Sequence, residues 1–166
     1  MEKILFVCTG NTCRSSMTEA LFRVHMEKDP GLCEKFCVGS AGLQAFEGDP
    51  ASRNSILALK RGWDIDLGSH RARKLSPADI ADSHLIFTMT RAHKEAIIER
   101  FPEYSGKVFT LTEYVSENPA DKASCGTSTQ YDIADPYGMP YDVYMECARQ
   151  LNEAVDKLAA KLRKIT

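Results

Sequence analysis

A short segment near the N-terminus combines a thiol, two turn-forming residues and an arginine. Residues 8–15 read Cys-Thr-Gly-Asn-Thr-Cys-Arg-Ser and follow an apolar run that is typical of a buried strand. Gly10 and Asn11 tolerate the left-handed backbone that a sharp turn from a strand into a helix requires. Such a turn points successive backbone N–H groups inward, and the following helix adds its positive N-terminal end. The pattern predicts an anion-binding nest with Cys8 at its mouth.

The residue types of Cys8 and Arg14 indicate what this nest would do with an anion. We expect the positive potential to stabilise the Cys8 thiolate and to lower its pKa below the value of about 8.5 for free cysteine. The planar guanidinium of Arg14 suits phosphate oxygens. A thiolate that faces a bound phosphoryl group predicts phosphoryl transfer through a cysteinyl-phosphate. The alternative is a buried Cys8 and an exposed Arg14 without chemistry, which the strand before and the glycine within the segment disfavour.

Phosphoryl transfer also needs a group that protonates the leaving group, and Asp135 is the candidate. It precedes Pro136 in an irregular segment, where the proline fixes the local backbone. Spacing alone favours a plain turn for an Asp-Pro pair, so both interpretations stay open at this point.

The segments around these residues alternate between strand and helix patterns. Strands are predicted for Lys3–Cys8, Lys35–Ser40, His84–Met89 and Lys107–Leu111, and helices for a stretch from about Arg14 and for Ser52–Gly62, Ser76–Ala81, Thr90 to about Arg100 and Tyr141–Lys164. This alternation predicts an α/β fold, a three-layer sandwich with a central parallel sheet flanked by helices. The functional crevice of such a sheet lies beyond the carboxyl ends of its strands, where Cys8 falls.

Length and composition indicate one ordinary globular domain over residues 1–166. The chain is 43% hydrophobic and 27% charged, and its net charge is −2. That charge gives no general attraction to nucleic acid or to an anionic membrane. No apolar run is long enough to span a bilayer, and the N-terminus lacks the features of a signal peptide. We therefore expect a cytoplasmic protein, whose oligomeric state the sequence leaves open.

The six cysteines are interpreted as thiols, because disulfides are rare in the cytoplasm. They are Cys8, Cys13, Cys33, Cys37, Cys125 and Cys147. Cys33 and Cys37 have no second pair and no histidine at ligand spacing, so a metal site is not predicted. We expect these two to be small, half-buried side chains in a strand.

The sequence resembles the low-molecular-weight protein tyrosine phosphatases over nearly its whole length. The resemblance rests on VCTGNTCRSSMTEA at the start, on Ser40–Gly42, on Ser69–Arg73 and on Asp135–Tyr137. It implies a phosphatase without metal or cofactor that acts on phosphorylated proteins and releases inorganic phosphate. Cys8 would be the nucleophile, and Asp135 would act as general acid in the first step and as general base in the second.

The resemblance also implies how the loop is used and supported. The phosphate-binding residues would be Thr9, Gly10, Asn11, Thr12, Cys13, Arg14 and Ser15. Ser15 would donate a hydrogen bond to the thiolate. Asn11 would brace the loop through Ser40 and His70, although His70 would otherwise be interpreted as an ordinary surface histidine. Cys13 would be able to form a disulfide with the nucleophile as a reversible redox switch; the alternative is a small packing residue.

Two positions bear on which phosphorylated residue is the substrate. Thr12 and Tyr137 would line the substrate crevice, and many tyrosine-specific members have a bulky aliphatic residue in place of Thr12. Gly138 stands where many of them have a second aromatic residue. Threonine at position 12, and the segment Val108–Val115, resemble the bacterial branch that acts on phosphoarginine. We therefore expect a protein arginine phosphatase, with a strict tyrosine phosphatase as the alternative.

Two other classes of protein fit the motif less well. A thioredoxin-coupled arsenate reductase shares this fold and loop, but it needs two further cysteines close together on a mobile segment. Residues 76–100 contain no cysteine, and Cys125 and Cys147 stand alone. A non-catalytic phosphate-binding module would need neither Cys8 nor Asp135.

Overall fold

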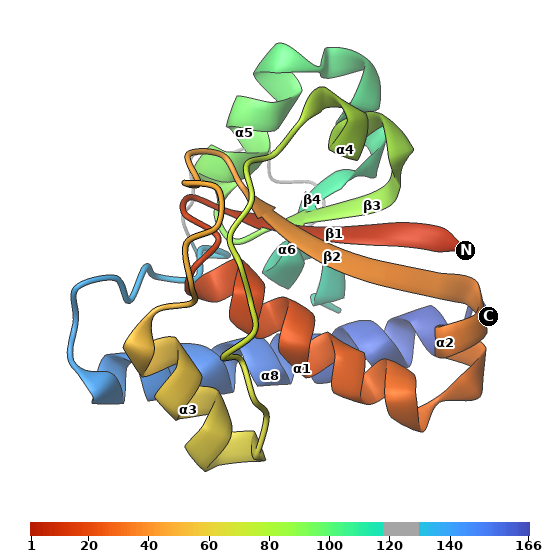
Figure 1. The fold of residues 1–166 in the computed structure, drawn as a ribbon. Coiled ribbons are helices and arrows are strands. Elements are labelled where there is room, and N and C mark those ends of the chain that lie inside the picture. The colour runs from red at the N-terminus through yellow and green to blue at the C-terminus, as the bar shows by residue number, and fades with distance from the viewer. Residues whose placement is uncertain (118–129) are drawn as a thin grey trace.

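The computed structural model describes residues 1–117 and 130–166, and it confirms the predicted α/β sandwich (Figure 1). The strands are β1 (Glu2–Cys8), β2 (Phe36–Gly42), β3 (Ser83–Thr88) and β4 (Val108–Thr110). The helices are α1 (Arg14–Lys28), α2 (Pro30–Lys35), α3 (Arg53–Trp63), α4 (Pro77–Asp82), α5 (Arg91–Arg100), α6 (Leu111–Val115) and α8 (Tyr141–Arg163), with a 3-10 turn at Pro102–Lys107. The strands form a parallel sheet in the order β2-β1-β3-β4.

Side chains that alternate along the central strand β1 build a separate core on each face of the sheet. Ile4 and Phe6 join the larger core, together with residues of α1, α2, α3, α6 and α8. Leu5 and Val7 join the smaller core, with residues of α4 and α5. All four side chains are fully buried. The strand therefore has the continuous apolar sequence expected of a parallel strand covered on both faces, and Figure 1 shows these two helical layers below and above the sheet.

The long helix α8 forms the base of the larger layer. Its apolar side chains recur at helical spacing, and they face α1, α3 and α6. The apolar stripe along this helix is buried, as shown by Tyr144, Leu151 and Leu158. Packing against α8 fixes the position of α1, whose first turn begins at the end of the cysteine-containing loop.

Several element boundaries differ from those predicted. The strand predicted for Lys107–Leu111 ends at Thr110, because Thr110 caps the short helix α6 in a capping box with Glu113. The strand predicted to start at Lys35 starts at Phe36 and runs through to Gly42. Cys33 was wrongly placed in a strand: it is exposed in α2, a helix capped by Asp29.

The end of α3 also differs from the sequence prediction. The predicted helix ends at Gly62, but α3 continues to Trp63. Asp64 then adopts a left-handed backbone with φ of 54° and closes the helix. Asp is one of the few non-glycine residues that takes this conformation readily.

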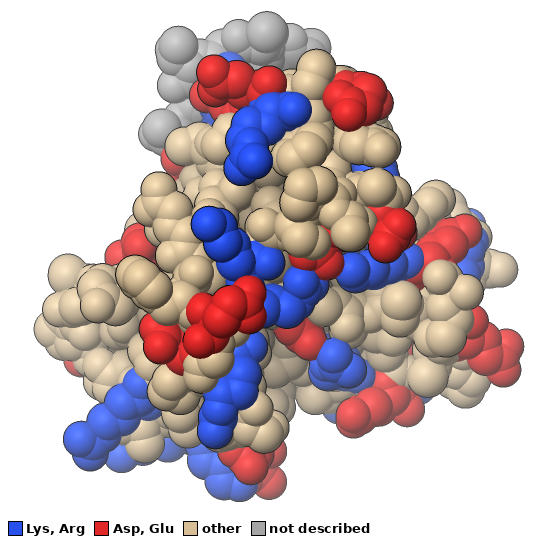
Figure 2. Space-filling model, turned by 45° about the horizontal axis from the view of Figure 1, so that its top comes forward, with Lys and Arg blue, Asp and Glu red and all other residues tan. Residues whose placement is uncertain are grey.

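Three segments that are distant in the sequence meet at the carboxyl edge of the sheet. Cys8, the last residue of β1, is in register with Gly42 of β2, and Val7 is in register with Thr88 of β3. Acidic and basic side chains are interspersed over the face seen in Figure 2. None of the helices in the described ranges is long and apolar enough to cross a bilayer. Cys125 lies outside the described residues.

Candidate active site

The loop between β1 and α1 folds back around the thiol of Cys8. Asn11 has a left-handed backbone with φ of 58°, as its residue type predicted. This turn aims the Asn11 amide at the thiol, with a distance of 3.3 Å from N to Sγ. The Cys8 Sγ also shares a hydrogen bond of 2.9 Å with the Ser15 hydroxyl, in the first turn of α1. The thiol is therefore surrounded by hydrogen-bond donors at the N-terminus of a helix.

The side chain of Asn11 ties the loop to its neighbours. Its Nδ2 donates to the Ser15 hydroxyl at 2.8 Å and to the Ser40 hydroxyl at 2.9 Å. Its Oδ1 accepts from the backbone N–H of Arg73 at 3.1 Å. The Asn11 carbonyl lies 2.7 Å from Nε2 of His70. The structure thus brings together Asn11, Ser40 and His70, and it adds a contact with residue 73 that the sequence did not indicate.

A second layer of interactions holds the segment that carries Arg73. The Arg73 guanidinium donates to Asp79 of α4 at 2.7 Å, and Lys3 donates to the other oxygen of Asp79 at 2.9 Å. Burial acts to raise the pKa of Asp79, but these two cations and Ser76 more than offset it and hold the pKa well below its ordinary value. Asp79 therefore stays charged, and it anchors the segment whose backbone braces Asn11.

Gly42 lets β2 approach the loop closely. A Cβ placed on Gly42 would lie 2.6 Å from the Thr9 carbonyl oxygen and 2.9 Å from the Asn11 nitrogen. The residues after Gly42 bond the loop directly: Leu43 N–H donates to the Cys8 carbonyl at 3.0 Å. No side chain fits at position 42 unless the loop moves.

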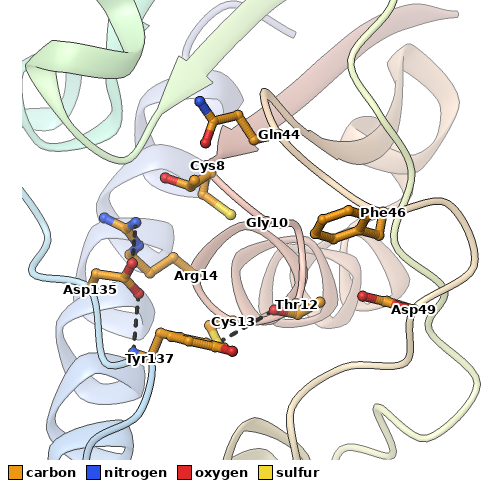
Figure 3. A pocket seen from close by; sticks show the side chains of 11 residues that line it. Cys8, Gly10, Thr12, Cys13, Arg14, Gln44, Phe46, Asp49, Asp135 and Tyr137 are labelled. Atoms are coloured by element: carbon orange, nitrogen blue, oxygen red, sulfur yellow. Dashed lines mark hydrogen bonds and ion pairs between the residues drawn. The ribbon is translucent and has the colours of Figure 1, made fainter.

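Arg14 is buried and held by the segment that carries Asp135. Its Nη1 donates to the carbonyl of Ile133 at 2.9 Å, and its Nη2 lies 3.3 Å from a carboxylate oxygen of Asp135. Its Nε is buried and has no hydrogen-bond partner among the residues that the structure describes. The guanidinium is thus fixed beside Cys8, and one of its N–H groups is left unpaired by the described part of the protein (Figure 3).

Asp135 lines the cleft beside Arg14. Its other carboxylate oxygen accepts from the N–H of Tyr137 at 3.1 Å, which shapes the turn around Pro136. About half of its side chain, 49%, is exposed. The carboxylate is therefore both oriented and in contact with solvent, as a group that gives and takes protons must be.

The cleft beside Cys8 has a volume of about 230 Å³. Its lining residues are Cys8, Thr9, Gly10, Thr12, Cys13, Arg14, Gln44, Phe46, Asp49, Asp135 and Tyr137. Thr12 and Tyr137, the two residues expected at the substrate crevice, are both in this lining. Gln44, Phe46 and Asp49 come from the loop between β2 and α3, which sequence reasoning did not associate with the site. No motif identifies them, because only the fold brings that loop to the cleft (Figure 3).

The thiol of Cys13 has polar neighbours of its own. Its Sγ lies 3.3 Å from the Ser52 hydroxyl and 3.7 Å from the Tyr144 hydroxyl. Burial raises the pKa of Tyr144 to about 12, so this hydroxyl stays protonated. Cys8 and Cys13 are both free thiols here. The proposed disulfide between them stays a prediction.

His93 of α5 is a neighbour of the loop that the sequence did not reveal. Its Nε2 shares a hydrogen bond of 2.8 Å with the Thr9 hydroxyl, and its Nδ1 is buried without a partner in the described part of the chain. Burial, and then the charge of Arg14, lower the pKa of His93 to about 4, against weaker opposing effects of Asp135 and Asp132. A neutral imidazole therefore supports Thr9 at neutral pH.

Comparison with known proteins assigns the chain to a family. The model of the "low molecular weight phosphotyrosine protein phosphatase" family matches residues 3–166. The chain belongs to this family. Within residues 1–117 and 130–166, no three His, Cys, Asp or Glu side chains are grouped so as to hold a metal ion.

Relatives in this family differ in the activity that their names state. A protein-arginine-phosphatase of Geobacillus stearothermophilus is 40% identical over 97% of this chain and 96% of its own length. The low molecular weight protein-tyrosine-phosphatase PtpB of Staphylococcus epidermidis is 34% identical over 96% and 98%. The structure of YwlE arginine phosphatase, as a mutant with a phosphorylated active-site serine, matches with a TM-score of 0.84 at 36% identity, over 98% of this chain and 96% of that one.

Proposed function

We propose that this protein removes phosphoryl groups from arginine side chains of phosphorylated proteins through a cysteinyl-phosphate. The observation that carries the chemistry is the thiol of Cys8, held by Ser15 and the Asn11 amide beside a buried Arg14. This arrangement combines a nucleophile, an anion nest and a guanidinium in one loop. We further propose that the protein acts in the cytoplasm.

In the first step the Cys8 thiolate attacks phosphorus. The P–S bond forms as the bond from phosphorus to the leaving nitrogen breaks, and the leaving nitrogen takes the bonding electrons and a proton from Asp135. The backbone N–H groups of the loop and the Arg14 guanidinium hold the equatorial oxygens, where negative charge develops. Arginine then leaves as its stable guanidinium.

In the second step water replaces the cysteine. Asp135, now a carboxylate, accepts a proton from the water as its oxygen bonds to phosphorus. The P–S bond breaks, Cys8 leaves as a thiolate, and inorganic phosphate is released. The hydrogen bond from Ser15 stabilises that thiolate as a leaving group, just as it stabilises it as a nucleophile.

Thr12 supports phosphoarginine as the substrate. Its hydroxyl is a polar feature of the cleft wall that an aliphatic residue would lack, and a guanidinium has N–H groups that can use it. The similarity to proteins named as arginine phosphatases agrees with this choice. Phosphotyrosine is the second candidate, because the exposed rings of Phe46 and Tyr137 at the cleft would also pack against a phenol.

Matched peptides that contain phosphoarginine or phosphotyrosine test the substrate. We expect kcat/KM to be higher for phosphoarginine, and Thr12→Ile to raise activity on phosphotyrosine while it lowers activity on phosphoarginine. Equal or faster turnover of phosphotyrosine by the unmodified enzyme would contradict the arginine assignment. Changes of about 10-fold are expected, since one side chain in a pocket contributes roughly 1–3 kcal/mol to discrimination.

The variant Cys8→Ser tests the mechanism separately from the substrate. We expect it to lose turnover of both peptides and to keep its affinity for inorganic phosphate, because the nest and Arg14 remain. A Cys8→Ser protein that turns over either peptide normally would rule out the cysteinyl-phosphate route. Arsenate-dependent oxidation of reduced thioredoxin by the unmodified enzyme would instead favour a reductase.

A further inference from the structure

Asp49 places a second carboxylate at the cleft. It lines the cleft from the loop between β2 and α3, and Figure 3 shows it beside Thr12, across from Arg14 and Asp135. The backbone of this loop is fixed: the Asp49 carbonyl accepts from Ala72 N–H at 2.7 Å, and its N–H donates to the Phe46 carbonyl at 3.2 Å. The backbone at Asp49 is therefore held in place in the cleft wall.

The two carboxylates of the cleft differ in their partners. Asp135 is oriented by Arg14 and by the Tyr137 N–H. The Asp49 carboxylate is exposed, and it has no ion pair and no side-chain hydrogen bond with the residues that the structure describes. It is thus available to a molecule that enters the cleft.

The chemistry proposed above requires only one carboxylate. Asp135 serves both steps, and no proton transfer is left for Asp49. Asp49 adds a negative charge to the wall of a cleft that holds a phosphate dianion, and like charges repel. A positive charge on the substrate offsets this repulsion.

We propose that Asp49 is a specificity-determining residue that binds the guanidinium of phosphoarginine. This inference rests on the proposed function. With phosphorus beside Cys8 and the leaving nitrogen beside Asp135, the remaining N–H groups of the planar guanidinium extend toward the wall formed by Thr12 and Asp49. A carboxylate accepts such N–H groups in charge-assisted hydrogen bonds.

Asp49 separates the two candidate substrates, whereas the aromatic residues at the cleft do not. The rings of Phe46 and Tyr137 can stack on a guanidinium or pack against a phenol. The ring of phosphotyrosine has neither a positive charge nor an N–H group to offer Asp49. The carboxylate therefore favours phosphoarginine and penalises phosphotyrosine at the same time, which is how a binding site discriminates against an alternative substrate.

The test compares Asp49→Ala and Asp49→Asn with the unmodified enzyme on matched phosphoarginine and phosphotyrosine peptides. For Asp49→Ala we expect kcat/KM to fall about 10-fold or more on phosphoarginine, mostly through KM, and to stay equal or rise on phosphotyrosine. Asp49→Asn keeps an acceptor oxygen, so its effect should be smaller. Removal of the negative charge should also strengthen the binding of anions in general. Competitive inhibition by inorganic phosphate, measured in each variant, gives the size of that effect.

Glu47→Gln is the matched control, because it removes one negative charge from the same loop at a position that does not line the cleft. Glu47 accepts from the Lys74 N–H at 2.7 Å, and the glutamine oxygen can do the same. We expect this variant to keep the ratio of the two activities.

Failure of this inference is distinguishable from failure of the proposed function. If the unmodified enzyme hydrolyses phosphoarginine and Asp49→Ala leaves the ratio of phosphoarginine to phosphotyrosine activity unchanged, the role of Asp49 is overturned and the function stands. If the unmodified enzyme does not hydrolyse phosphoarginine, the proposed substrate and the role of Asp49 fall together. A ratio that falls in Asp49→Ala but not in Glu47→Gln supports the proposal.

Discussion

Asn11 supports the loop through both its backbone and its side chain. Its backbone is left-handed, and its backbone N–H donates to the Cys8 thiol. Its side chain forms hydrogen bonds with the hydroxyls of Ser15 and Ser40 and with the backbone N–H of residue 73. The backbone conformation and the side-chain hydrogen bonds can be tested separately, because glycine adopts the left-handed backbone readily but forms no side-chain hydrogen bonds. Substitutions at this position can therefore show which demand matters for catalysis.

We expect both Asn11→Gly and Asn11→Ala to lower kcat by roughly 100-fold, because both lose the brace that orders the loop. Asn11→Ala should in addition unfold more easily than Asn11→Gly by about 1 kcal/mol, because alanine is strained at a φ of 58°. Steady-state kinetics and urea unfolding measure the two effects. If Asn11→Gly keeps full activity, the hydrogen bonds of the side chain do not order the site.

Gly42 allows a second test of the loop, from the side of β2. Gly42→Ala should lower kcat/KM at least 10-fold, because its Cβ would force the Thr9 carbonyl and the Asn11 amide out of place. Gly39→Ala, in the same strand, is the control: its Cβ would meet no atom closer than 3.9 Å. A Gly42→Ala enzyme as active as Gly39→Ala would mean that the loop tolerates displacement.

Individual residues of the site were predictable from the sequence to different degrees. Cys8, Arg14 and the left-handed turn follow from residue types within one continuous segment. His70 and Ser40 came only from family resemblance, because nothing local links them to Asn11. Asp49 and His93 were missed altogether: each reaches the site through the tertiary fold, and no short-range pattern reports that.

At the scale of elements, the four strands, the long helices and the short helix α4 were predicted, and the short helices α2 and α6 were not. The helix α2 has a local signal that was overlooked, with Asp29 as its cap and Pro30 in its first turn. The helix α6 was not predicted, and the strand predicted before it included the first residue of this helix, Leu111. The change from strand to helix at Thr110 depends on its hydrogen bonds with Glu113, and hydrophobic periodicity does not indicate such bonds.

The packing of α5 against the phosphate-binding loop makes stability depend on pH. His93 has a pKa of about 4 in the folded protein and about 6.5 when unfolded, so the unfolded chain binds more protons between these values. The free energy of unfolding should therefore be highest above pH 6.5 and fall as the pH drops toward 4. We expect His93 to account for a loss of about 2–3 kcal/mol across that range.

The variant His93→Gln isolates this contribution, since glutamine cannot titrate but can still bond to the Thr9 hydroxyl. Urea unfolding at a series of pH values should give a shallower decline for His93→Gln than for the unmodified protein between pH 6.5 and 4. Parallel curves would mean that the pKa of His93 is the same in the folded and in the unfolded protein.

At the scale of the whole molecule, the site is a junction of segments from both helical layers. The loop after β1 is braced by β2, by the segment of residues 70–73, by α5 and by the segment of Asp135. An anion in the nest therefore favours the assembled state of all these segments over the unfolded chain. Binding at one loop should stabilise the molecule as a unit.

Inorganic phosphate tests this consequence directly. At a concentration 100 times its Kd, it should add about 2.7 kcal/mol to the free energy of unfolding, which corresponds to a rise in Tm of roughly 5–10 °C for a domain of this size. Cys8→Ser should keep the rise, because the nest is intact. Arg14→Ala should lose most of it, because the buried guanidinium supplies the main positive charge. If phosphate leaves the Tm of the unmodified protein unchanged, the loop does not bind phosphate. The proposed phosphatase mechanism, which depends on that binding, would then be wrong.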